Sequence, residues 1–237
     1  MMAGLYKPTK SRLNMIQLPD FHNAFDYEND FYLSCDASRL AKFLAHFQLL
    51  EKTSAIDGTI VECGVFKGAS FSRFAMFRKI LNLEKKRLVG FDTFNRFPET
   101  DFEKDKGLRS RFIEFAGELS ISTSQLMEVL QNKECAENVE LVDGDITKTV
   151  PNFAQRNADI KISLLNLDVD IYEPTVTILE HLFPLITPGG ILILDDYNSF
   201  PGETLAVDNY IKGKQVEIRE PIIPGTPHYI VKREDCG

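Results

Sequence analysis

The chain has 237 residues, and 43% of them are hydrophobic, which is enough to bury one sizeable core. Its 35 acidic and 27 basic residues give a formal net charge of -8, which argues against binding nucleic acid by neutralising phosphates. A small or neutral substrate fits this charge better, so we expect no nucleic-acid partner.

The four cysteines give no sign of a zinc site or a disulfide framework. Cys35, Cys63, Cys135 and Cys236 are widely spaced, with no C-x-x-C pair and no companion histidine spacing. Residues 1–15 hold no apolar stretch typical of a signal peptide, and no run approaches the ~18 apolar residues of a membrane span. We therefore expect a soluble cytoplasmic protein with no membrane partner.

The N-terminal region combines an arm with one helix. Residues 1–34 are aromatic and polar without a clean period, which predicts an irregular arm. Residues 38–52 are predicted to be helical, since apolar residues recur at helical spacing: Leu40, Phe43, Leu44, Phe47 and Leu50. We therefore divide the chain into residues 1–58, an arm and helix that serve as a lid or as contacts in a homo-oligomer, and residues 59–237, the globular domain.

From residue 59 onward, apolar strands alternate with helices. Strands are predicted over residues 59–63, 87–91, 139–142, 162–167, 190–194, 215–218 and 228–232. Helices are predicted over residues 69–81, 172–185 and 202–211, with another beginning at 122–124, and a charged loop over 99–111 is a candidate mobile flap. This alternation predicts an α/β fold, a doubly wound, mostly parallel, seven-stranded sheet with helices on both faces.

Acidic residues stand where the first five of these strands end. Ligands bind outside the carboxyl ends of the strands in such sheets. Like charges gathered there repel one another unless a cation or hydrogen-bond donors satisfy them. The strand-end acids are Glu62, Asp92, Asp143, Asp145, Asp168, Asp170, Asp195 and Asp196. The sequence therefore predicts a ligand site at this edge of the sheet.

The first strand leads into a turn that contains Gly64 and Gly68 and opens a helix. Glycine at the strand end permits a tight turn and a close approach of a ligand to the backbone, although a plain strand-to-helix turn would look the same. The spacing departs from the G-x-G-x-x-G of dinucleotide sites. Asp92 ends the neighbouring strand, where a carboxylate can accept both hydroxyls of a ribose, unless it only caps the following turn.

Asp168 and Asp195 end strands that are neighbours in any sheet where one right-handed crossover joins them. Adjacent strands lie only ~4.8 Å apart, so carboxylates at matching ends can share one ion, and Asp196 can supply a third oxygen. Three carboxylates without histidine or cysteine select a hard cation, Mg²⁺ by default, or Mn²⁺ or Ca²⁺. The alternative is that Asp195 and Asp196 cap the following turn.

Two other enzyme classes share part of this pattern. The segment L-D-V-D-I-Y resembles the D-x-D-x-T motif of haloacid-dehalogenase-type phosphatases, but Tyr172 stands where they have threonine. A nucleotide-sugar glycosyltransferase could also use such a D-x-D, although the glycine turn and Asp92 would then be unexplained.

Five segments together resemble the macrocin O-methyltransferase (TylF-like) family, which methylates sugar hydroxyls of antibiotics and related glycosides. They lie between Thr59 and Tyr197 and read V-E-C-G-V-F-K-G-A-S, G-F-D-T-F-x-x-F-P, D-G-D-I-T-K-T-V-P, L-N-L-D-V-D-I-Y-E-P-T and G-G-I-L-I-L-D-D-Y. This resemblance implies a methyltransferase domain that binds S-adenosylmethionine.

The resemblance also implies roles for individual residues. It places Glu62, Gly64 and Gly68 along the methionine portion of the cofactor, Asp92 at the ribose and Asp145 near the adenine, with Val65, Ser70, Thr93 and Asp168 as further contacts. Asp168, Asp195 and Asp196 match the metal-binding carboxylates. Asp170 matches a position proposed as the general base in some members, and Asp168 is the second catalytic candidate. The alternative for Asp170 is a supporting or surface carboxylate.

We therefore expect an O-methyltransferase that uses S-adenosylmethionine and a divalent cation to methylate a sugar hydroxyl on a small molecule. A catechol-like or phosphorylated acceptor would suit the same cofactor and ion. A protein that binds S-adenosylmethionine without turnover is the remaining alternative. His228 is interpreted as an ordinary strand histidine rather than an acceptor contact.

Overall fold

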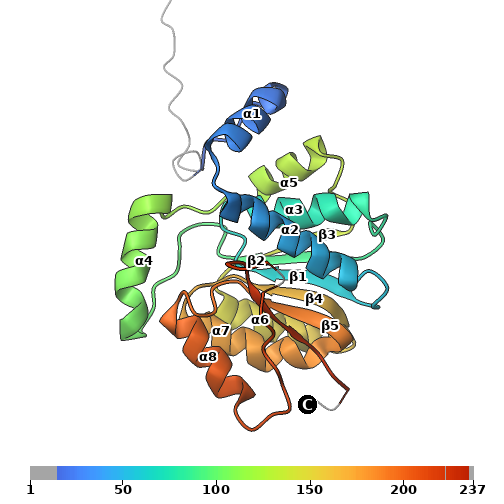
Figure 1. The fold of residues 1–237 in the computed structure, drawn as a ribbon, viewed down its shortest axis with the longest axis vertical. Helices are drawn as coiled ribbons and strands as arrows, with labels where there is room; N and C mark the ends of the chain where they lie inside the picture. The colour runs from blue at the N-terminus through green and yellow to red at the C-terminus, as the bar shows by residue number, and fades with distance from the viewer. Residues whose placement is uncertain (1–14, 222, 235–237) are drawn as a thin grey trace, which may run out of the picture.

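A single sheet of six strands organises the described chain (Figure 1). The computed structural model describes residues 15–221 and 223–234. The strands are β1 (Thr59–Cys63), β2 (Leu88–Asp92), β3 (Val139–Asp143), β4 (Ile162–Leu167), β5 (Ile186–Leu194) and β6 (His228–Val231). They run in the order β3-β2-β1-β4-β5-β6, with β1 to β5 parallel and β6 antiparallel to β5. The predicted doubly wound, mostly parallel sheet is confirmed.

Helices cover both faces of this sheet (Figure 1). One face packs against α2 (Ala37–Lys52), α3 (Ala69–Ile80) and α5 (Thr123–Asn132), and the other packs against α6 (Ile146–Arg156), α7 (Tyr172–His181) and α8 (Pro201–Ile211). Beside them lie α1 (Ala24–Ser34), α4 (Glu103–Ala116) and the short 3-10 helices η2 (Phe21–Asn23) and η3 (Phe183–Leu185). None of the helices in the described ranges has the length and apolar character needed to cross a membrane.

The central strands read as unbroken apolar runs because each of their faces is buried. In β1, Ile60 packs in the cluster that contains Phe74 of α3, whereas its neighbour Val61 packs in the cluster that contains Val150 of α6. Successive side chains of a strand point to opposite faces, so both sets need an apolar partner. This two-sided core fixes the sheet and thereby the positions of the strand ends.

The prediction of seven strands was wrong, because residues 215–218 form no strand. An isolated bridge between Arg219 and Tyr229 follows directly after this segment. The residues that follow it include Pro221, Pro224 and Pro227. Proline has no backbone N–H to donate to a ladder, so the residues after Arg219 cannot extend the pairing with β6.

Three local predictions also differ from the structure. The charged segment 99–111 is largely helical, because α4 begins at Glu103 and continues to Ala116. The arm contains a helix, α1, none of whose residues is buried, whereas residues 1–14 of the predicted arm lie outside the described residues. Helix α6 was not predicted.

Cys35, Cys63 and Cys135 are free thiols, and Cys236 lies outside the described residues.

Candidate active site

Asp168 and Asp195 lie side by side at the carboxyl ends of β4 and β5. The two strands pair in register up to Leu167 and Leu194, and the ladder continues for one more bond, from the Asp195 N–H to the Leu167 carbonyl at 3.0 Å. Parallel pairing therefore places the two aspartates at matching positions, as the sequence predicts. Carboxylate oxygens of Asp168, Asp195 and Asp196 come within 4.8 Å of one another.

The site lies where the strand order reverses. The chain crosses from β3 at one edge to β4 on the other side of β1, so the loops after β1 and β4 diverge and leave a crevice between them. A cavity of about 480 Å³ occupies this position. Eight of the predicted residues line it, namely Gly64, Asp92, Thr93, Asp145, Asp168, Asp170, Asp195 and Asp196. Four others, Glu62, Val65, Gly68 and Ser70, are not among its lining residues.

Asp92 is held by the turn that follows β1 and by the turn that follows β2. Its carboxylate accepts a hydrogen bond from the backbone N–H of Phe66 at 2.9 Å and another from that of Phe94 at 2.7 Å. Asp92 therefore caps the turn that follows β2, which was the alternative interpretation, and it also lines the cavity. Carboxylate oxygens have several acceptor positions, so these two bonds leave capacity for ribose hydroxyls.

Asp145 caps a helix and lines the cavity as well. It is the N-cap residue of α6, where its carboxylate accepts from the Thr147 backbone N–H at 3.0 Å and from the Thr147 hydroxyl at 2.6 Å. Lys148 forms an ion pair with the other oxygen at 3.0 Å. These contacts fix the first turn of α6 at the wall of the cavity opposite the aspartate cluster.

Glu62 is completely buried in β1. One of its oxygens accepts a hydrogen bond from the Asn166 side-chain amide at 3.0 Å, whereas the other has no hydrogen-bond partner. Burial raises the pKa of Glu62 to about 7. The residue therefore lies beneath the cavity floor, as a supporting group between β1 and β4.

Burial governs the ionisation of the aspartate cluster. It raises the pKa of Asp168 and of Asp196 well above the ordinary value, and the neighbouring carboxylates raise both further. Burial and the charge of Asp168 raise the pKa of Asp170 to about 7. The carboxyl groups of Asp170 and Asp196 also act on each other, and the charge of Asp170 helps to raise the pKa of Asp196. Asp170 also adopts a left-handed backbone conformation with φ of 64°, which is strained for aspartate.

Two residues of α2 complete the cluster and were missed by the sequence prediction. The Lys42 ammonium forms an ion pair with one oxygen of Asp195, and Nε2 of His46 lies 3.3 Å from the other. Burial disfavours the charged Lys42 side chain, but the carboxylates of Asp168 and Asp195 outweigh this effect and raise its pKa. Burial alone would raise the pKa of Asp195, yet Lys42 and His46 lower it below its ordinary value.

Glu203 of α8 supports the turn after β5. It is fully buried, and one oxygen accepts a hydrogen bond from the backbone N–H of Asp196 at 3.1 Å. Its other oxygen has no partner. Burial and the charge of Asp196 raise the pKa of Glu203 well above its ordinary value, so it adds a further acid behind the cluster.

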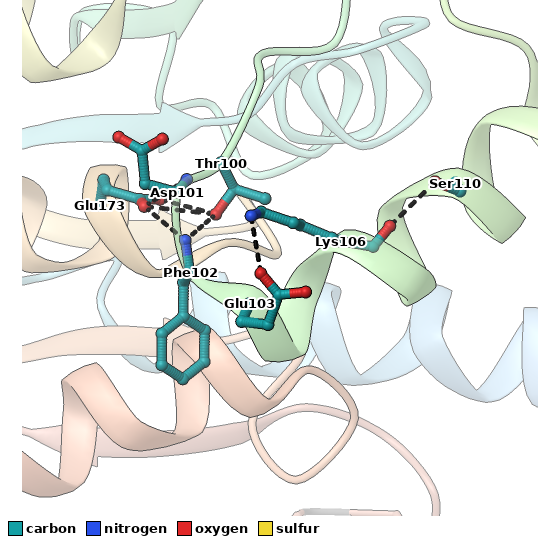
Figure 2. A network of polar contacts seen from close by, with 7 residues as sticks. All are labelled: Thr100, Asp101, Phe102, Glu103, Lys106, Ser110 and Glu173. Atoms are coloured by element: carbon teal, nitrogen blue, oxygen red, sulfur yellow. Dashed lines mark hydrogen bonds and ion pairs between the residues drawn. The ribbon is translucent and has the colours of Figure 1, made fainter.

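The segment before α4 covers the cavity and is held by Glu173 of α7 (Figure 2). The Glu173 carboxylate accepts hydrogen bonds from the backbone N–H groups of Asp101 at 2.9 Å and Phe102 at 3.1 Å, and from the Thr100 hydroxyl at 3.0 Å. The Phe102 ring stacks on that of Tyr172 with centroids 5.1 Å apart. The expected flap is therefore a docked wall of the site in this structure.

Asp105 of α4 fixes the other side of this flap. Its carboxylate is fully buried and accepts from the backbone N–H of Tyr172 at 3.0 Å and from that of Gly202 at 2.8 Å. These two amides belong to the first turns of α7 and α8, where N–H groups lack helical partners. One acidic side chain thus joins three helices, and no local sequence pattern indicates it.

A second groove of about 660 Å³ lies next to Asp195 and Asp196. Tyr197 and His228 line it, with ring centroids 5.3 Å apart, and Nε2 of His228 lies 3.8 Å from the Glu220 carboxylate. Lys42, Asp195 and Asp196 line both the groove and the main cavity. His228 therefore begins β6, as interpreted, and also lines this groove.

Residues 31–224 match a family model described as Macrocin-O-methyltransferase (TylF). A curated relative from Streptomyces olivaceus, 8-demethyl-8-(2,3-dimethoxy-alpha-L-rhamnosyl)-tetracenomycin-C 4'-O-methyltransferase, is 27% identical over 60% of this chain and 54% of its own length. Demethyldecarbamoylnovobiocin O-methyltransferase from Streptomyces niveus is 26% identical over 65% of this chain and 58% of its own. The chain thus spans little more than half the length of these relatives.

The fold has close counterparts among solved structures. The calicheamicin methyltransferase CalS11 superposes with a TM-score of 0.72 at 25% identity, covering 97% of this chain and 99% of the other. The O-methyltransferase NovP gives a TM-score of 0.68 at 22% identity, covering 82% and 80% of the two chains. Both comparisons agree with the doubly wound sheet described above.

Proposed function

We propose, from the premise that this chain belongs to the macrocin O-methyltransferase (TylF) family, that it transfers the methyl group of S-adenosylmethionine to a sugar hydroxyl of a small molecule. The observation that carries the proposal is the cavity that joins the ends of β1 to β5, because Asp92 and Asp145 lie along one part of it and the aspartate cluster along another. The tetracenomycin relative is named as a methyltransferase acting on a rhamnosyl-bearing compound, which supports a sugar acceptor.

The cofactor half of the cavity fits an adenosine with its hydroxyls toward Asp92. Gly64, Asp92 and Thr93 form the wall near the ends of β1 and β2, and Asp145 with Ile146 forms the wall near the end of β3. Carboxylates that are already oriented by backbone N–H groups can accept ribose hydroxyls at little entropic cost. Cofactor binding is therefore assigned to this half of the cavity.

The aspartate cluster fits a hard divalent cation. Asp168, Asp195 and Asp196 offer carboxylate oxygens alone, close enough together to share one ion, which is the donor set that Mg²⁺ and Mn²⁺ prefer. Such an ion, when bound, would orient the acceptor hydroxyl and lower its pKa. The cluster therefore assigns the acceptor oxygen to the edge of the cavity formed by β4 and β5.

Asp170 is the proposed general base. In the transfer, a bond forms from the acceptor oxygen to the methyl carbon, the carbon–sulfur bond breaks, and the hydroxyl proton passes to the Asp170 carboxylate. Its side chain lines the cavity beside Asp168, and burial raises its pKa, so its carboxylate accepts a proton more readily than an exposed aspartate would. Aligning the two reactants supplies much of the remaining acceleration.

Methyl transfer from labelled S-adenosylmethionine to sugar, nucleotide-sugar and phenolic acceptors tests the proposal, with Mg²⁺ present or removed by chelator. We expect turnover on a sugar hydroxyl that requires the ion. The Asp168→Ala variant should lose ion-dependent turnover while S-adenosylhomocysteine binding, measured by calorimetry, weakens much less. Full activity of that variant in chelator would contradict the metal role, and failure to bind S-adenosylhomocysteine would contradict the cofactor assignment.

A further inference from the structure

Lys42 and His46 lie one turn apart on α2 and both reach Asp195. At this spacing of four residues, two side chains project from the same face of a helix. The Lys42 ammonium contacts Oδ2 of Asp195, and Nε2 of His46 lies 3.3 Å from Oδ1. Asp195 is only 2% exposed, so both of its oxygens are engaged by this one helix.

The two contacts differ in how freely each partner can move. The Lys42 side chain is 34% exposed and lines both the main cavity and the second groove, so there is open space on two sides of it. The His46 ring is fully buried and stacks on Phe74, with centroids 5.1 Å apart and planes inclined by 16°. Lys42 can therefore leave Asp195 by rotating about its own side-chain bonds, whereas His46 cannot.

The Lys42 ammonium and a divalent cation would serve the same purpose at this cluster, because each supplies positive charge to the carboxylates. Three carboxylates within 4.8 Å of one another repel unless positive charge lies between them. Lysine supplies one such charge on Oδ2 of Asp195, but a cation bound by the cluster needs oxygens of the same three side chains. An ammonium has only hydrogens to offer, so it cannot join the coordination of that ion, and its positive charge repels a cation held by the same carboxylate.

We propose that Lys42 is a displaceable counter-ion of the aspartate cluster, which neutralises Asp195 in the metal-free protein and leaves it when a divalent cation binds. His46 is a positioning residue that holds the other oxygen of Asp195 in both states. The inference rests on the metal site of the proposed function. It predicts opposite effects for two neighbours on one helix, because losing Lys42 removes a competitor and losing His46 removes a support.

Calorimetric titration with Mn²⁺ tests this directly. Lys42→Met should bind the ion more tightly than the wild type, by about two- to fivefold, from the usual strength of a partly exposed ion pair. His46→Phe keeps the stack on Phe74 but loses the hydrogen bond, so its Kd should rise about tenfold or more. Equal or weaker Mn²⁺ binding by Lys42→Met would overturn the proposal.

Arg73 of α3 supplies a matched control for charge alone. Its positive charge acts on the His46 ring, but no ion pair of the described residues joins it to Asp195. Arg73→Met removes one positive charge, as Lys42→Met does, but it leaves Oδ2 of Asp195 paired with Lys42. Its Kd for Mn²⁺ should therefore change by less than about twofold in ordinary salt. An equal gain in both variants would mean that general charge, rather than displacement, controls binding.

A crystal structure of the wild-type protein with Mn²⁺ provides a test that does not depend on the folding of any variant. The Lys42 ammonium should no longer lie within hydrogen-bond distance of Asp195, while Nε2 of His46 should remain there. An ion on the cluster with the Lys42 contact intact would overturn the inference and leave the proposed function standing. Failure of the wild type to bind Mn²⁺ at all would instead overturn the metal site itself.

Discussion

A Cβ atom placed on Gly64 would lie 1.6 Å from the carbonyl oxygen of Asp168. The turn after β1 and the turn after β4 therefore meet backbone to backbone at the floor of the site. The sequence pattern at this glycine indicates a tight turn with close approach of a ligand to the backbone, or a plain strand-to-helix turn. In the structure, the neighbouring strand end approaches it first, and the side chain of Asp168 is placed as a result.

Gly64→Ala should destabilise the protein by about 3 kcal/mol or more, since alanine would also have to adopt a φ of +94°. Chemical denaturation would measure the loss in the free energy of unfolding. Gly107→Ala is the matched control, because this exposed glycine of α4 has no atoms near its added Cβ position. That variant should be more stable than the wild type by about 0.5–1 kcal/mol. Equal effects of the two substitutions would contradict the packing argument.

Glu62 should give the protein a stability that declines with pH. Burial raises its pKa from 4.5 to about 7 in the folded chain. Between these values the unfolded chain releases the proton while the folded chain retains it, so the free energy of unfolding falls as pH rises, by at most about 1.4 kcal/mol per unit for one group. The contribution is complete below pH 4.5 and lost above about 7.

Glu62→Gln removes this titration while preserving shape, so its stability relative to the wild type should increase from pH 5 to pH 8. Denaturation curves at several pH values in that window provide the measurement. Glu134→Gln serves as the control, because the Glu134 side chain is 84% exposed. Its stability difference from the wild type should stay nearly constant. A constant difference for Glu62→Gln as well would show that Glu62 is ionised in the fold.

Local sequence patterns were sufficient to predict the strand ends. Runs of apolar residues stop at Gly64, Asp92 and Asp168, and each stop marks the carboxyl end of a strand. Parallel pairing then places neighbouring ends together, so the meeting of Asp168 with Asp195 needed no knowledge of side-chain packing. Helix α6 escaped prediction because Pro151 stands inside it and removes one of its hydrogen bonds.

Contacts between distant segments were beyond the sequence. Lys42 reaches Asp195 across 153 positions, and Asp105 reaches Gly202 across 97. Nothing in the spacing of α2 separates Lys42 from an ordinary solvated lysine, because its role depends on where the helix docks. The left-handed backbone of Asp170 was equally unforeseen, because aspartate adopts a positive φ more readily than most residues but does so at only a minority of its positions.

Asp170→Asn should reduce kcat by about 100-fold or more, the usual contribution of a general base, and leave S-adenosylhomocysteine affinity nearly unchanged. The wild-type kcat should rise with pH through the titration of the base, because only the ionised carboxylate accepts the proton. In Asp170→Asn that rise should disappear. Steady-state rates from pH 5.5 to 8.5 at saturating substrate give both results. A variant that keeps the wild-type profile would exclude Asp170 as the base.

Glu173→Ala should loosen the wall of the cavity formed by residues 99–101. The substitution removes the acceptor of three hydrogen bonds, two of them from backbone N–H groups, and hydrogen bonds to a charged group are worth about 1.5–3 kcal/mol each. We expect faster hydrogen exchange at Asp101 and Phe102, and S-adenosylhomocysteine binding weakened by about tenfold or more, since residues 97–101 line the cavity.

Glu103→Ala is the matched control for this prediction, because Glu103 belongs to the same network (Figure 2). Its carboxylate is 86% exposed and pairs only with Lys106 among the ion pairs of the described residues. An exposed pair of this kind contributes about 0–1 kcal/mol, so neither hydrogen exchange near residue 101 nor binding should change. If Glu173→Ala matched this control in both measurements, Glu173 would not hold the wall in place, and the aromatic stack of Phe102 on Tyr172 would be sufficient.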